Sequence, residues 1–135
     1  MKAVIDTNIF ISSFFGGKPR QVIDLWKTGN LILCFSADIL GEYMRVLHRM
    51  GLEPAEELAE LLDLLATSPN VSFVRDPDPV RVVVEDPDDD KFIACALALK
   101  AGVIISGDKA LLGISRYRGI PILSPAAFLK RFFPD

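Results

Sequence analysis

Short apolar runs alternate with longer amphipathic segments along most of the chain. The runs are brief, as buried strands usually are, and the segments between them carry apolar residues at helical spacing. Because parallel strands need crossover connections, which are usually helices, this alternation predicts βαβ units and a parallel sheet covered on both faces. The expected strands are residues 3–5, 31–35, 71–74, 103–106 and 121–123.

Helices are expected between and after these strands. Gly51 and Gly102 should end two of them, and Ser124 should cap the last one, with Pro125 in its first turn. The predicted fold class is therefore α/β, a three-layer α/β/α sandwich with a central parallel sheet of about five strands. We expect a single domain over residues 1–135. The expected helices are residues 19–29, 36–51, 53–67, 88–102 and 124–133.

Composition sets limits on the class of protein. Half of the 135 residues are hydrophobic, which suits one domain with a sizeable core and favours a homodimer that covers the remaining apolar surface. No apolar run approaches the roughly 18 residues of a membrane helix, and the first residues lack a signal-peptide pattern, so we expect a cytoplasmic protein without membrane contact. Cys34 and Cys95 lie in apolar segments and should be reduced core residues. The net charge of −3 means that a polyanionic ligand would need a bound metal or a local basic patch.

Two aspartates are expected at the ligand-binding edge of the sheet. Open parallel sheets bind ligands beyond the carboxyl ends of their strands, where the strand order reverses. Asp6 follows the first expected strand in KAVIDTN, and Asp108 follows a later one in GVIISGD. Both side chains should therefore lie at that edge.

A third acid, Glu42, lies within the helical segment SADILGEYMRVLHRM. At about 100° per residue it falls on the margin of the apolar stripe, where it could reach a cleft while the helix stays packed. The alternative is a surface ion pair with Arg45 or Arg49.

A run of carboxylates stands immediately before an apolar helical segment. Pro87 suits a first helical position, which makes Asp86 the expected N-cap and places the next acids in the first turn, where the helix dipole favours each anion by about 0.3–1 kcal/mol. Capping needs one or two acids, so the excess leaves two interpretations open, a solvated helix cap or a metal site. The run consists of Glu85, Asp86, Asp88, Asp89 and Asp90.

Considered together, these acids favour a divalent-metal site. They come from four different elements that the expected topology could bring to one edge. Four carboxylates within a few ångströms would not all ionise without a cation, because each one raises the pKa of the next. Oxygen ligands without His or Cys favour Mg²⁺ or Mn²⁺ over zinc, and such sites carry out phosphoryl chemistry. The four acids are Asp6, Glu42, one member of the aspartate run, and Asp108.

The chain resembles PIN domains, and among them the VapC-like toxins of bacterial and archaeal toxin–antitoxin pairs. The resemblance covers almost the whole chain, through VIDTNIFISSFF, SADILGEYMRVL, DPDDDKFIACALALKAGVIISGD and RGIPILSPAAFL. The DTN triplet is weak evidence, whereas the acid, helix, strand and SGD in that order are fairly specific. The resemblance implies endonucleolytic hydrolysis of single-stranded RNA by metal-activated water, leaving a 5′-phosphate and a 3′-hydroxyl, and a small antitoxin protein as partner.

The resemblance also implies which acids act. In this branch the third acid is followed by two variable residues, two apolar residues and an alanine at the seventh place. The seventh residue after Asp89 is Ala96, whereas the seventh residue after Asp90 is Leu97. A neighbouring pattern, DKFIA, keeps Asp90 as a second candidate ligand. The implied catalytic acids, which would hold one or two Mg²⁺ or Mn²⁺ ions directly or through water, are Asp6, Glu42, Asp89 and Asp108.

Supporting roles follow from the same resemblance. Thr7 and Ser106 would orient metal-bound water, and Asn8 would brace the loop after the first strand. His48, on the polar side of its helix, is expected to face solvent and to take no part in catalysis.

Basic and aromatic residues near the strand ends are candidates for RNA contacts. Phe14 and Phe15 could stack on bases, although such side chains are more often core or dimer contacts. Affinity for RNA should be modest and salt-sensitive. The basic candidates, each with the alternative of an ordinary surface residue, are Lys18, Arg20, Lys109, Arg116 and Arg118.

Three other functions are alternatives to this one. A receiver-type phosphoacceptor domain would need paired acids after the first strand, and the pair is missing. A haloacid-dehalogenase-like phosphatase would need an aspartate two residues after Asp6, where Asn8 stands. A PIN-fold binding module without catalysis is the third alternative, and the four matching acids argue against it.

Overall fold

A computed structural model describes residues 1–51, 63 and 65–134 of the chain. Within these residues, six strands form one sheet in the order β3-β2-β1-β4-β6-β5. Each predicted parallel strand is present, which confirms the α/β class, and the additional β5 pairs antiparallel with β6 at one edge. The strands are β1 (Lys2–Ile5), β2 (Ile32–Ser36), β3 (Val71–Val74), β4 (Val103–Ile105), β5 (Arg116–Tyr117) and β6 (Ile120–Leu123).

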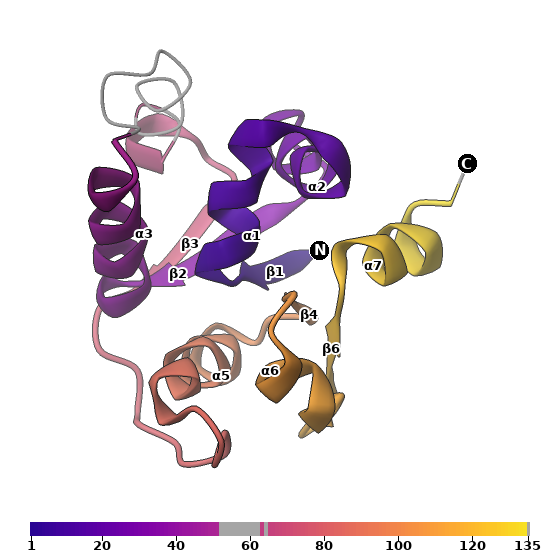
Figure 1. The fold of residues 1–135 in the computed structure, drawn as a ribbon. Coiled ribbons are helices and arrows are strands. Elements are labelled where there is room, and N and C mark those ends of the chain that lie inside the picture. Colours follow the sequence, from indigo (N-terminus) through magenta and orange to yellow (C-terminus); the bar gives the residue numbers. More distant parts are fainter. Residues whose placement is uncertain (52–62, 64, 135) are drawn as a thin grey trace.

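Helices cover both faces of the sheet, which gives the expected three layers (Figure 1). On one face α1 contacts both α2 and α3, and α2 contacts α7; on the other, α5 packs across β1 to β4. No described helix has both the length and the apolar character needed to cross a bilayer. The helix expected over residues 53–67 lies largely outside the described residues. The described helices are α1 (Thr7–Ser12), α2 (Gly17–Lys27), α3 (Ala37–Arg49), α5 (Asp90–Leu99), α6 (Lys109–Ile114) and α7 (Pro125–Phe132), with short 3-10 turns η1 (Ser13–Phe15) and η2 (Pro87–Asp89).

Helix ends mostly follow the sequence signals. The Ser124 hydroxyl accepts the Ala127 amide at 3.1 Å and caps α7, as predicted. Gly51 follows α3 in the left-handed region, with φ of 69°. The prediction that Gly102 ends the α5 segment is wrong, because Lys100 takes the left-handed position and Gly102 already bonds to β1, donating to the Lys2 carbonyl at 2.8 Å.

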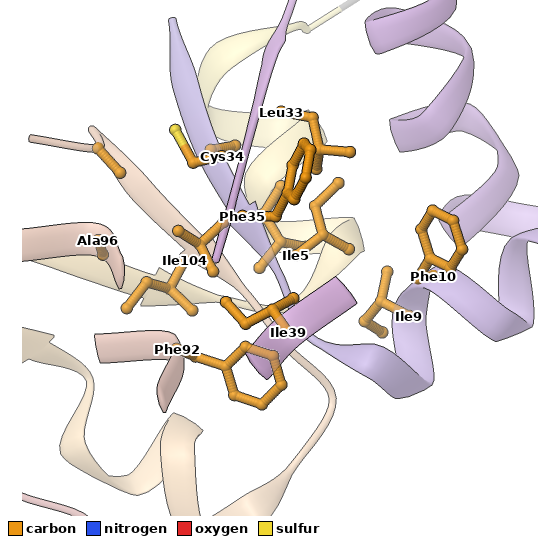
Figure 2. Close-up of a cluster of buried hydrophobic side chains, with 14 of the residues drawn as sticks. Ile5, Ile9, Phe10, Leu33, Cys34, Phe35, Ile39, Phe92, Ala96 and Ile104 are labelled. Atoms are coloured by element: carbon orange, nitrogen blue, oxygen red, sulfur yellow. The ribbon is translucent and has the colours of Figure 1, made fainter. Parts of the chain in front are cut away.

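The core lies on both sides of the central strands. Figure 2 shows Ile9 and Phe10 of α1 on one side of Ile5 of β1, and Phe92 of α5 and Ile104 of the neighbouring strand β4 on the other side. All five side chains are buried, and removal of this apolar surface from water is the main force that holds the layers together.

Both cysteines are buried free thiols, as predicted. Burial raises the pKa of Cys34 to about 11 and that of Cys95 to about 12. Since the thiolate is the reactive form, neither thiol is a nucleophile at neutral pH.

The strand order reverses next to β1. The chain passes from β1 to β2 and β3 in one direction, then returns to β4 on the other side of β1. This reversal opens a crevice at the carboxyl ends of β1 and β4, which is where open parallel sheets bind ligands. Asp6 directly follows β1, and Asp108 follows β4 after Ser106 and Gly107.

Candidate metal centre

A polar hollow lies at the carboxyl ends of β1 and β4. It receives side chains from the start of α1, from α3, from the η2 turn and from the start of α6. All four acids predicted to be metal ligands line it, together with two further acids of the aspartate run; their metal binding and catalysis stay predictions. We call it the acidic hollow, and its lining residues are Asp6, Thr7, Asn8, Glu42, Val46, Arg49, Asp86, Asp88, Asp89, Phe92 and Asp108.

Asp6 is the most deeply buried acid of the acidic hollow, with 3% of its surface exposed. Its Oδ1 accepts the Ile9 amide at 2.9 Å, which caps α1, and its Oδ2 accepts the Ser106 hydroxyl. The Ser106 oxygen in turn accepts the Asp108 amide at 2.9 Å, so one hydroxyl joins the ends of β1 and β4. Burial raises the pKa of Asp6, although the hydrogen bonds from Ser106 and Ile9 oppose the shift.

Glu42 is held through both carboxylate oxygens. Its Oε1 accepts from Lys91 Nζ at 2.8 Å, and its Oε2 accepts the Thr7 hydroxyl. The neighbouring Tyr43 hydroxyl donates to the Ile5 carbonyl, which ties α3 to the end of β1. The Glu42 position on the helix margin therefore reaches the acidic hollow, which was one of the two interpretations left open by the sequence, and the ion pair that Glu42 forms there is with Lys91.

Three carboxylates approach within ligand distance of one another. Asp86, Asp89 and Asp108 each offer one oxygen, and these oxygens all lie within 4.8 Å of one another. The Oδ2 of Asp89 is buried and has no hydrogen-bond partner. Burial raises the pKa of Asp89 to about 8, and a hydrogen bond with Asp108 and the negative charges of Asp108, Asp86 and Asp6 add to the shift.

These donors fit a hard divalent cation. Asp89 is half-buried, and its buried Oδ2 lacks the hydrogen-bonding or positive partner that a charged oxygen removed from water requires. The donor set contains oxygen only, which suits Mg²⁺ or Mn²⁺. A cation there would offset the mutual repulsion that raises the pKa of Asp89.

Asp90, the second candidate ligand of the run, has a different partner. Its Oδ1 accepts the amides of Val82 at 2.9 Å and Val83 at 2.7 Å, and it does not line the acidic hollow. Asp90 thus fixes the irregular segment that precedes η2. This placement supports Asp89 over Asp90 as the acid of the site.

Sequence reasoning missed two residues of the acidic hollow region. Asp86 stands at the N-cap position of η2, as expected, but its side chain makes no capping hydrogen bond and lies near Asp89 and Asp108. Lys91 is the second of these residues, and its ammonium pairs with Glu42 and, at 3.2 Å, with Asp88. The run contains more acids than a helix cap needs, and this excess was the sequence signal for Asp86. No sequence signal indicated Lys91.

Other predicted residues occupy varied positions. Asn8 is exposed at the acidic hollow, and its bracing role stays a prediction, as does water orientation by Thr7 and Ser106, whose hydroxyls donate to carboxylates. His48 is exposed, as expected. Arg20 donates to the backbone carbonyls of Ser13 and Phe14, and its contact with phosphate stays a prediction.

Stability without metal should depend on pH through Asp89. Its folded pKa of about 8 lies above the ordinary value of 3.8, so the folded state holds the proton more tightly than the unfolded state. The resulting stabilisation is complete below pH ~4 and is lost as the pH rises through ~8. We expect the Tm in EDTA to fall between about pH 5 and 8.5, and Mn²⁺ to restore it at the alkaline end. Thermal denaturation across this range tests the point, and a Tm in EDTA that climbs with pH would contradict it.

Comparisons with known proteins agree with this geometry. A profile of the PIN domain family matches residues 2–110. The curated sequence named "Uncharacterized protein MJ1680", from Methanocaldococcus jannaschii, is 33% identical over 143 aligned positions, which cover 98% of this chain and 92% of that protein. PIN domains are generally metal-dependent nucleases, and the match over most of the chain shows that this protein belongs to the PIN domain family.

Proposed function

We propose that the protein is a Mg²⁺- or Mn²⁺-dependent endoribonuclease that cleaves single-stranded RNA. The observation that carries the proposal is the clustering of carboxylate oxygens from Asp86, Asp89 and Asp108, together with the buried Oδ2 of Asp89, which has no hydrogen-bond partner. Membership of the PIN domain family supports nuclease chemistry. The choice of RNA follows the resemblance of the sequence segments to VapC-like toxins.

Two carboxylates of the site, those of Asp6 and Glu42, are held by hydrogen bonds in advance of any reaction. Asp86, Asp89 and Asp108 would hold the cation, which when bound lowers the pKa of water and offsets charge on the phosphate. Ser106 keeps Asp6 beneath them, and Thr7 fixes Glu42 beside them. Groups held in place by such bonds need little reorganisation during the reaction, which is a main source of electrostatic catalysis.

Two exposed side chains suit a single nucleic-acid strand. Arg49 lines the acidic hollow near the end of α3, where its guanidinium could bind a phosphate next to the scissile one. Phe15, with 70% of its surface exposed, follows α1 and offers a ring on which an unpaired base could stack. A base-paired strand has no free base face for such a contact.

The proposal includes a biological setting. The chain would act as the toxin of a toxin–antitoxin pair, with a small antitoxin protein as partner, and as a cytoplasmic homodimer. The resemblance of the sequence segments supports the toxin role, and the high apolar content supports the dimer.

A cleavage assay tests the proposed function. Purified protein with Mn²⁺ should cut a 5′-labelled single-stranded RNA internally, leaving 5′-phosphate ends, and EDTA should reduce the rate by about a hundredfold or more. Duplex RNA and single-stranded DNA of the same sequence should be cut more slowly. Asp24→Asn, on the exposed face of α2, is the matched control and should cleave normally. Cleavage that persists in EDTA, or RNA binding without cleavage in Mn²⁺, would contradict the proposal.

A further inference from the structure

Lys91 places a positive charge against the acidic hollow. Its side chain is only 12% exposed, and its Nζ lies 2.8 Å from Oε1 of Glu42 and 3.2 Å from Oδ2 of Asp88. Both of these acids line the acidic hollow, whereas Lys91 itself does not. The ammonium therefore contacts the site through these two carboxylates, while Lys91 itself lines a neighbouring pocket with Ser36, Asp38 and Asp90.

The Lys91 contact changes what Glu42 can do. Oε1 of Glu42 accepts from Lys91, and Oε2 accepts the Thr7 hydroxyl. A divalent cation bound to Oε1 would lie close to the ammonium on the same oxygen, and like charges at that separation repel strongly. Glu42 is thus already paired with a cation, in contrast to Asp89, whose Oδ2 is buried without a partner.

We propose, building on the proposed nuclease function, that Lys91 is a positioning residue that takes the place of a second metal ion. Its ammonium neutralises Glu42 and holds it against the acidic hollow. The three clustered carboxylates then receive a single divalent cation. The number of metal ions in this protein is therefore set by a side chain of α5, and the one-ion ligand set is Asp86, Asp89 and Asp108.

Metal stoichiometry in the absence of RNA tests this inference. Titration of the protein with Mn²⁺, followed by electron paramagnetic resonance of the free ion, should give one bound ion per chain. In Lys91→Met the unpaired Glu42 should recruit a second ion, giving two. Lys91→Arg keeps the positive charge and should bind one. The matched double variant Glu42→Gln/Lys91→Met lacks the carboxylate that the second ion needs and should return to one.

The outcomes separate this role from a merely structural ion pair. If Lys91 only stabilised the fold, Lys91→Met would lower the Tm and still bind one ion. That result would overturn the inference. Two bound ions in the unaltered protein would also overturn it. If circular dichroism shows that Lys91→Met does not fold, the Glu42→Gln variant tests the inference by itself. It should keep one ion with affinity changed less than about threefold, and a loss of tenfold or more would show that Glu42 is a direct ligand.

The same titration separates this inference from the nuclease proposal. One bound ion, with the expected response of the variants but no cleavage of RNA, would overturn the nuclease function and leave the role of Lys91 standing. Metal-dependent cleavage with two ions in the unaltered protein would overturn the role of Lys91 and leave the nuclease function standing. A protein that binds no Mn²⁺ would overturn both.

Discussion

Asp89→Asn is expected to lower metal-dependent RNA cleavage by roughly a thousandfold. Asp89 belongs to the carboxylate cluster with Asp86 and Asp108 and carries a buried oxygen without a hydrogen-bond partner, whereas the amide of asparagine carries no charge to bind the cation. Single-turnover cleavage of a labelled RNA at saturating Mn²⁺ measures the effect. Asp24→Asn, at an exposed carboxylate that does not line the acidic hollow, is the control for the general effect of removing one negative charge.

The same substitution should stabilise the metal-free protein. At pH 8 the Asp89 carboxylate is crowded by other acids, and asparagine removes this repulsion. Because the carboxyl is partly exposed and solvent screens it, we expect a gain on the order of 1 kcal/mol in EDTA, or a few degrees in Tm. Lost activity combined with raised metal-free stability is a signature that damage to the fold cannot produce. A variant that cleaves at the normal rate, or that melts below the unaltered protein in EDTA at pH 8, would refute this account of Asp89.

Asp90→Ala, in contrast to Asp89→Asn, is expected to destabilise the protein, with a loss of about 2–4 kcal/mol of folding free energy. Its carboxylate accepts two backbone amides, and one of them belongs to Val83, which is 2% exposed. Alanine leaves both donors without this acceptor. Urea denaturation measures the loss. Asp90→Asn keeps a carbonyl oxygen for the same two bonds, so it should lose less than about 1 kcal/mol and remain active.

The activity of the Asp90 variants shows whether Asp90 holds the segment before η2 in place or binds the metal ion. The segment that Asp90 holds leads directly into Asp86, so Asp90→Ala should weaken the metal site, and excess Mn²⁺ should restore part of the rate. If Asp90→Asn is inactive while Asp89→Asn cleaves RNA, the metal ligand of the run is Asp90 and the assignment here is incorrect.

Much of the fold follows from local pattern. The parallel strands were predictable because each is a short apolar run bounded by turn residues, as in Val71–Val74. The place of Asp6 and Asp108 followed from the same pattern, since strand-end residues of a parallel sheet share one edge. The strand β5 was missed because Arg116–Tyr117 is too short to carry a periodic signal.

The partners of the aspartate run could not be read from the sequence. The direction of Asp86 depends on the path of an irregular segment, and that path is fixed by bonds from Asp90 to amides seven and eight residues earlier in the chain. The pairing of Lys91 in α5 with Glu42 in α3 joins two residues that are 49 positions apart in the sequence. Spacing rules describe regular elements, so they assign Asp86 to a cap position and give no information on where its carboxylate turns.

The most direct test of the account is anomalous diffraction at the manganese edge from crystals grown with Mn²⁺. We expect a peak in the acidic hollow within coordination distance of Asp86, Asp89 and Asp108, and its loss in Asp89→Asn. A hollow without a peak at saturating Mn²⁺, or a peak at a site remote from these carboxylates, would contradict the claim that these acids assemble to bind a catalytic cation.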